Sequence, residues 1–220
     1  MENEVSRILH ASRIILAIVV LWPGASLSTA VGPFIAHERS REEARQTVSP
    51  EFWGEAVSGL RIAIAPVTTG AWPGRGAQLA IGLQNVGDKD FVLNLGSILA
   101  NGRVMFPDAI QLTLTDEKGL TRELQFFDRR YPVVAGRIDD FTVALRSGST
   151  YLLRTNLDNY WSKATKEFTL TLPDGRYRIA ARLEGQGARH VNLDTPGIAH
   201  MKFWKGLAQS NVLEFRVGGH

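Results

Sequence analysis

The segment Leu172-Pro-Asp-Gly-Arg-Tyr-Arg-Ile-Ala-Ala-Arg-Leu183 decides the fold of this chain, together with Asn211-Val-Leu-Glu-Phe-Arg-Val217 near its end. Both segments alternate between apolar side chains and charged or small ones. The apolar positions are Tyr177, Ile179, Ala181 and Leu183 in the first segment, and Leu213, Phe215 and Val217 in the second. Alternation with a period of two predicts β-strands that have one buried face and one solvated face.

Working backwards from this segment, the same alternation recurs along the chain. It occurs at residues 60–64, 78–84, 91–95, 110–114, 120–127, 141–145, 151–153 and 168–172. Turn residues separate these runs, and Asn101-Gly102 is a pair typical of tight turns whose central residues have positive φ. Strand patterns do not alternate with helical ones. The sequence therefore predicts about nine or ten short strands in an all-β, antiparallel β-sandwich.

The run Leu172-x-x-Gly175-x-Tyr177 resembles the tyrosine corner of Greek-key sandwiches, in which the Tyr hydroxyl bonds back to the connecting loop. With Gly148-Ser-Thr-Tyr151 and the closing segment 204–217, residues 60–217 resemble immunoglobulin-like and fibronectin type III-like domains of exported bacterial proteins. The resemblance implies a Greek-key sandwich over residues 60–220. It also implies structural roles for Leu172, Gly175 and Tyr177.

The chain departs from antibody domains at a defined position. Ile179 stands where the antibody pattern has a cysteine two residues after the corner tyrosine, with Ile81 as its counterpart. The third strand carries no tryptophan. We therefore expect an aliphatic core, and antigen-type recognition does not carry over to this chain.

The first 30 residues have the pattern of a signal peptide. Arg7 and Arg13 precede the apolar run Ile14 to Trp22, Pro23-Gly24 ends this run, and small residues lead up to Ala30. Cleavage after Ala30 would place the mature chain in the periplasm or outside the cell, with no membrane span left. The alternative is a retained anchor, because apolar character resumes at 31–36.

Residues 31–59 are expected to form a short helical extension before the sandwich. Ser49 and Pro50 are residues typical of a helix N-cap and first helical position, and Phe52, Trp53, Ala56 and Val57 follow at helical spacing up to Gly59.

Composition excludes several classes of function. The chain has 25 Lys and Arg against 22 Asp and Glu, a net charge of +3, and the basic residues form no stripe, so we expect no nucleic-acid partner. It has no cysteine. A disulfide framework and cysteine-based catalysis or metal binding are thereby excluded.

Motifs for catalysis or metal binding are missing from the sequence. There is no Gly-x-Ser-x-Gly motif, and His190, Asp194 and His200 lack the spacing of a zinc site. The oxygen-rich runs 139–140 and 156–159 lack an EF-hand pattern and are typical of turns. We therefore expect no catalytic residues, no metal and no cofactor.

Two long loops, 128–140 and 184–210, are the expected binding regions, because loops at the end of a sandwich carry most binding sites. Within or beside them lie the candidate binding residues Arg129, Arg130, Tyr131, Tyr160, Trp161, His190, His200 and Trp204. The sequence favours a non-catalytic exported module that recognises protein or glycan through these loops. The alternatives are a secreted hydrolase with a dispersed active site and a protease-inhibitor-like sandwich that presents residues 129–134.

Overall fold

The computed structural model describes residues 53–67, 72–73, 75–99, 101–127, 136–162, 164 and 170–218, which lie in one unit spanning residues 46–220. These residues form twelve β-strands and two short 3-10 helices, η3 (Leu157–Asn159) and η4 (Pro196–His200). Every pairing between two of the strands is antiparallel. The predicted all-β class is confirmed.

The strands form three sheets. The first has the order β1-β2-β8 and consists of β1 (Leu60–Pro66), β2 (Gln78–Asn85) and β8 (Thr150–Asn156). The second has the order β11-β10-β5-β6-β9, with β12 also paired to β10; it consists of β5 (Ile110–Asp116), β6 (Thr121–Phe126), β9 (Tyr160–Ser162), β10 (Gly175–Glu184), β11 (Leu207–Gln209) and β12 (Leu213–Val217). The third has the order β4-β3-β7 and consists of β3 (Phe91–Leu99), β4 (Val104–Phe106) and β7 (Asp139–Leu145).

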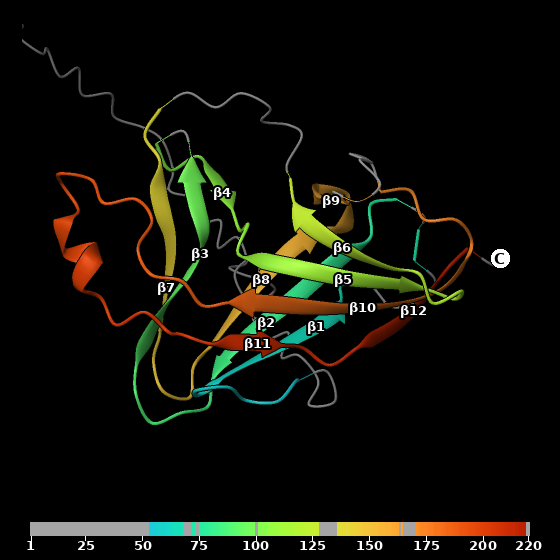
Figure 1. Ribbon diagram of the computed structural model, residues 1–220, viewed down its shortest axis with the longest axis horizontal. Coiled ribbons are helices and arrows are strands. Elements are labelled where there is room, and N and C mark those ends of the chain that lie inside the picture. Colours follow the sequence, from blue (N-terminus) through green and yellow to red (C-terminus); the bar gives the residue numbers. More distant parts are fainter. Residues whose placement is uncertain are drawn as a thin grey trace, which may run out of the picture. The chain divides into compact units, whose positions relative to one another are not determined.

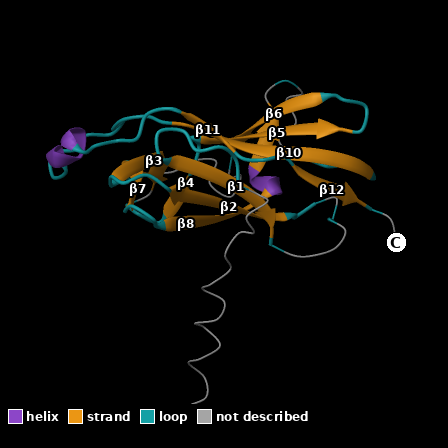
Figure 2. Ribbon diagram, turned by 90° about the horizontal axis from the view of Figure 1, so that it is seen from below, coloured by secondary structure: helices purple, strands orange, loops and turns teal. Residues whose placement is uncertain are grey.

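The first and second sheets are the two layers of a sandwich (Figures 1 and 2). One continuous core of aliphatic and aromatic side chains joins residues from both layers. Ile81 of β2 and Ile179 of β10 are both fully buried in it. Burial of apolar surface between the layers stabilises the sandwich.

Strand β10 is the central strand of the second sheet. It pairs with β5 along one edge, and with β12 and then β11 along the other edge. Its buried residues include Tyr177, Ile179 and Leu183, whereas Arg176 and Arg178 are exposed. The alternation in the sequence thus predicts correctly which face of β10 is buried.

Tyr177 makes the hydrogen bond expected of a tyrosine corner. Its hydroxyl donates to the carbonyl oxygen of Pro173 at 2.9 Å, and its ring stacks against Phe215 with a centroid distance of 5.5 Å. Leu172 is buried in the same core, and burial raises the pKa of Tyr177 above its ordinary value. The loop that enters β10 is therefore tied to the start of the strand.

The turn predicted at Asn101-Gly102 is also present. It joins β3 to β4, and φ is +56° at Asn101 and +89° at Gly102. Asparagine and glycine are the residues that tolerate this left-handed conformation best.

Two local predictions are wrong over the residues described. The expected helix across 49–59 does not continue through its described part, because Trp53 forms an antiparallel bridge with Ala63 and Val57 forms another with Leu60. The expected strand at 168–172 is absent from residues 170–172, although Leu170 is buried. Three strands of only three residues, β4, β9 and β11, were not expected.

The proposed signal peptide, residues 1–30, lies outside the described residues, as do residues 31–52. Within the described part of the chain, no helix has the length and apolar character needed to span a membrane.

Candidate functional site

The longest connection in the described chain, residues 185–206, leaves the sandwich at the end of β10 and returns to it in β11. We call this segment the apical loop. Its two ends meet at a hydrogen bond of 2.8 Å from the amide of Gly185 to the carbonyl of Gly206. From there the loop extends beside β7 and β3, with η4 far from β10 in both views (Figures 1 and 2).

Trp204 closes the base of the apical loop. Its side chain is buried, and its indole Nε1 donates to the carbonyl of Val57 at 3.1 Å. The backbone passes so close to the ring that a Cβ atom at Gly185 would lie 2.6 Å from Trp204 Cε3, and one at Gly206 would lie 2.9 Å from Trp204 Cζ2. Trp204, a candidate binding residue by sequence, is thus a packing residue.

Buried Asp140 of β7 holds the first part of the apical loop. Only 4% of this residue is exposed, and its Oδ2 accepts hydrogen bonds from the backbone amides of Arg189 at 2.8 Å and His190 at 3.2 Å. A carboxylate that accepts two amide hydrogen bonds fixes the backbone at this point. The course of the loop is therefore set by the sheet beneath it.

The side chains of Arg189 and His190 add further bonds to β3 and to the connection between β4 and β5. Arg189 forms a two-pronged ion pair with Asp108, with distances of 2.8 and 3.2 Å, and donates to Ser97 Oγ at 3.0 Å. His190 Nε2 lies 3.3 Å from the same Ser97 oxygen. Two-pronged arginine–carboxylate pairs combine strength with a fixed geometry.

A second group of bonds holds the outer part of the loop. Asn192 Nδ2 donates to Asp139 Oδ1 at 2.7 Å, and Arg137 pairs with both Asp139, at 2.7 Å, and Asp194. Hydrogen bonds to Asp139 and then to Asp194 raise the pKa of Arg137 above its ordinary value. The loop is therefore tied to β7 and to the chain just before it.

Apolar side chains face solvent from this anchored loop. Val191 is 55% exposed, Met201 is 47% exposed and Leu193 is fully exposed at 102%. Ile138, whose carbonyl accepts a hydrogen bond from Asn192, is exposed as well. We call Ile138, Val191, Leu193 and Met201 the apolar tip.

The remaining predicted binding residues do not assemble into one site. Tyr160 is completely buried and contacts Phe126 edge-to-face, so it is a core residue. Trp161 is half-buried on β9, and His200 is exposed in η4. Arg129, Arg130 and Tyr131 lie outside the described residues. Of the eight candidates, only His190 and His200 belong to the exposed or half-buried part of the apical loop.

The contacts of His190 bear on the hydrolase alternative. Its ring contacts Ser97, but among the residues described no carboxylate bonds to that ring, and Ser97 Oγ also accepts from Arg189. A serine nucleophile needs a base that is itself oriented by a third group. The geometry therefore matches a structural hydrogen-bond network rather than a catalytic one.

Oxygen-rich segments considered for calcium are occupied by internal bonds. Asp139 and Asp140 bind the apical loop, and Asn156 caps η3 by accepting from the amide of Asp158. In the described part of the chain, no three His, Asp or Glu side chains are grouped so that they could hold a metal ion.

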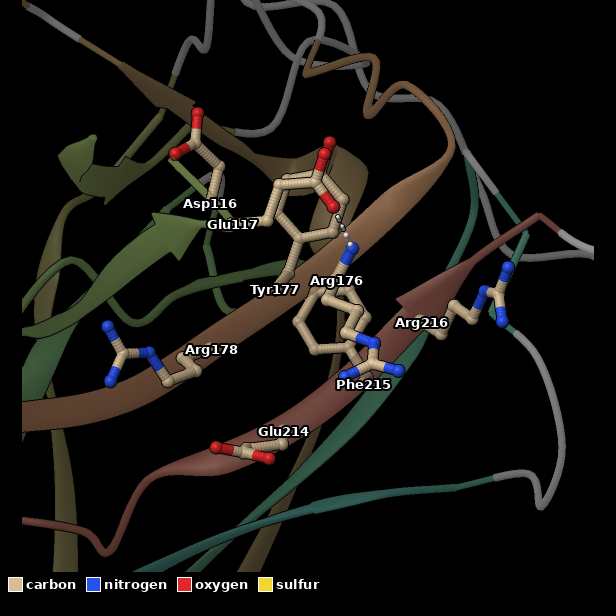
Figure 3. Close-up of a pocket in the computed structure, with 8 residues that line it drawn as sticks. All are labelled: Asp116, Glu117, Arg176, Tyr177, Arg178, Glu214, Phe215 and Arg216. Carbon is tan, nitrogen blue, oxygen red and sulfur yellow. Dashed lines mark hydrogen bonds between the residues drawn. The ribbon is translucent and has the colours of Figure 1, made fainter. Parts of the chain in front are cut away.

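A separate groove lies at the other end of β10. It has a volume of about 590 Å³ and is lined by Asp116, Glu117, Arg176, Tyr177, Arg178, Glu214, Phe215 and Arg216 (Figure 3). Asp116 is committed to its own turn, where its Oδ1 accepts from the amides of Lys118 and Leu120. The other charged side chains extend from the exposed face of β10 and β12 and from the β5–β6 turn.

Comparisons with known proteins give no family for this chain. No protein-family model matches the sequence, and no curated protein is similar to it. Among solved structures, a Bacteroides uniformis beta-glucuronidase matches with a TM-score of 0.29 and 12% identity. The match covers 70% of this chain but only 13% of the glucuronidase chain, and a likeness this low carries no argument about function.

The apolar tip was missed by sequence reasoning. Val191, Leu193 and Met201 are ordinary core-forming residues, and nothing local distinguishes an exposed leucine from a buried one. The one available signal was the length of the loop, which marked the region but not the residues.

Proposed function

We propose that this protein is an exported, non-catalytic binding module of the bacterial envelope, with an immunoglobulin-like or fibronectin type III-like sandwich, and that it binds a protein partner through the apolar tip. The sandwich supplies a rigid base, and the apical loop supplies the contact surface. Fold alone does not define a function, so the proposal depends on the loop.

The observation that carries this proposal is the full exposure of Leu193 on a loop held by Asp140, Arg189 and Asn192. Exposed apolar side chains that form a patch on an ordered loop are typical of a protein interaction site. Because the loop is already fixed, little conformational entropy is lost when it binds. Burying an apolar anchor such as Leu193 in a partner's pocket would contribute about 1.5 to 3 kcal/mol.

Protein fits the apolar tip better than glycan. Sugar rings are stacked on flat aromatic side chains. Of the aromatic candidates, Tyr160 and Trp204 are buried in the core, and half-buried Trp161 lies on β9 rather than in the apical loop. The tip presents aliphatic side chains and a thioether, which gain most from entering an apolar pocket.

Export rests on the sequence of the first 30 residues. To test it, the protein expressed with its own leader is recovered from the cell envelope and its intact mass is measured. We expect a chain that begins at Val31. A chain that still begins at Met1 would show that the leader is retained as an anchor.

Binding is tested by site-specific photo-crosslinking in the producing cell. A photoreactive residue replaces Leu193, and the matched control carries it at Leu120, which is 56% exposed in the β5–β6 turn at the opposite end of β10. We expect a discrete protein adduct at position 193 that disappears when Met201→Asp is added. Adducts of equal intensity at both positions, or none at 193, would contradict the proposal.

A further inference from the structure

The groove at the start of β10 contains an arrangement of charges that the proposed function does not use. Arg176 of β10 and Arg216 of β12 are directly opposite each other in the strand pairing, so both side chains leave the same face of the sheet. Both residues are exposed, and they line the groove together (Figure 3).

Neither arginine side chain has a hydrogen-bonding or ion-pairing partner among the residues that the structure describes. Glu117 of the β5–β6 turn accepts a hydrogen bond of 3.5 Å from the backbone amide of Arg176. Two residues further on, Arg178 and Glu214 are also directly opposite each other, and there the charges are of opposite sign. The groove therefore has one complementary cross-strand pair and one repulsive pair.

Like charges directly opposite each other destabilise an antiparallel pair. Two arginines placed opposite each other make this strand pairing less stable than a neutral or oppositely charged pair would. Positions at which a residue lowers stability are concentrated at functional sites. A ligand anion between the two guanidinium groups would remove the repulsion. Guanidinium groups suit this role because each can donate two parallel hydrogen bonds to one oxyanion.

The lining also contains hydrogen-bond acceptors. The carboxylates of Glu117 and Glu214 flank the two arginines, and they can accept from ligand hydroxyl groups. An acidic peptide is a less suitable ligand for this groove. Its additional carboxylates would repel those of Glu117 and Glu214, and it has no hydroxyl groups to donate to them. A ligand that carries both an oxyanion and many hydroxyls satisfies both sets of groups.

We propose that the groove is a second binding site, specific for an anionic polysaccharide, in which Arg176 and Arg216 bind one carboxylate or sulfate group and Glu117 and Glu214 accept hydrogen bonds from sugar hydroxyls. The groove lies at the end of β10 opposite the apical loop. The two sites therefore function independently, and the loss of one leaves the other intact.

The experiment compares three polymers with the same backbone: dextran, carboxymethyl dextran and dextran sulfate. Polyglutamate serves as the peptide alternative, and binding to the full chain is measured by calorimetry. We expect both anionic dextrans to bind at least about tenfold more tightly than dextran and than polyglutamate, with affinity falling as salt rises. Equal binding of dextran and its anionic forms, or tighter binding of polyglutamate, would overturn the proposal.

Variants separate the arginine pair from general positive charge. The double variant Arg176→Gln with Arg216→Gln should lose roughly tenfold or more in affinity for the anionic dextrans, whereas Arg178→Gln should lose about threefold or less. A loss for Arg178→Gln as large as that of the double variant would mean that the pair of Arg176 and Arg216 has no specific role, and the specific site would be rejected. Crosslinking through Leu193 should be unchanged in every one of these variants.

A stability measurement distinguishes binding from a structural role. Without ligand, the double variant should unfold at the same temperature as the parent or at a higher one, since the repulsion is gone. A lower unfolding temperature would show that the arginines support the fold, and it would contradict the inference.

Discussion

The hydroxyl of Tyr177 donates a hydrogen bond to the carbonyl oxygen of Pro173, four residues earlier in the chain. This bond holds the loop before β10 against the strand, while the Tyr177 ring fills the core beside Phe215. The same residue thus has a polar role and an apolar role, and two substitutions can separate them.

Tyr177→Phe removes the hydrogen bond and keeps the ring, so we expect it to lower the free energy of unfolding by about 0.5 to 1.5 kcal/mol. Tyr177→Ala also leaves a cavity and should cost about 3 to 5 kcal/mol. Denaturant unfolding of both variants beside the parent measures these differences. A Phe variant as stable as the parent would show that the corner bond contributes nothing.

Tyr160 provides the opposite case. Tyr160 is 0% exposed, and its hydroxyl interacts with the Thr155 hydroxyl, but neither group makes a well-formed hydrogen bond in the described part of the chain. Burying an unpaired hydroxyl is unfavourable, so Tyr160→Phe should leave the free energy of unfolding unchanged or raise it by about 1 kcal/mol. The same denaturant experiment tests this, and a loss comparable to that of Tyr177→Phe would reveal a hydrogen bond at Tyr160.

Gly185→Ala tests the base of the apical loop. The added methyl would lie 2.6 Å from both Cε3 and the carbonyl oxygen of Trp204, so the ring must move, at a cost of about 1 to 3 kcal/mol. Near-ultraviolet circular dichroism should report the change around the indole. Gly187→Ala is the matched control, because only the end of the flexible Lys205 side chain lies nearby, at 3.3 Å. Similar effects of the two changes would argue against this packing.

Asp140→Ala tests how the loop is held on β7. It leaves the amides of Arg189 and His190 without their acceptor, so we expect faster hydrogen exchange across residues 187–194 and a loss of about 1 to 3 kcal/mol. Asp194→Ala is the control: its ion pair with Arg137 is on the surface, so its loss should cost much less stability than the loss of Asp140. If exchange in the loop is unaffected by Asp140→Ala, the buried carboxylate does not order it.

The sequence predicts the scaffold of this protein far better than its surface. Alternation in β10 and β12 correctly indicates which residues are buried, because an antiparallel sandwich imposes a period of two on every strand. The helix expected up to Gly59 was wrong for a tertiary reason. Trp53 and Val57 pair with Ala63 and Leu60, and such pairing overrides local helix signals.

Whether a candidate binding residue is exposed depends on which other residues cover it, and no local sequence pattern encodes this. Tyr160 was expected beside a loop, but a three-residue strand is too short to show a period, and it places this ring in the core. Leucine is usually a buried residue, whereas Leu193 is fully exposed. The loop that carries Leu193 is held in place by the bonds of Asp140 to the Arg189 amide and of Arg189 to Asp108, and these residues are distant in sequence.

The hydrogen bond between Gly185 and Gly206 brings the two ends of the apical loop together at the edge of the sandwich. Leu183 and Ala208 already pair just before this point, so β10 and β11 form a hairpin whose register does not depend on what is inserted beyond it. A segment of another length or sequence could replace residues 186–202 without rebuilding the sheet, provided that Phe203 and the buried Trp204 are kept. This part of the molecule can therefore serve as a cassette, whose sequence and binding specificity can change while the sandwich beneath it stays the same.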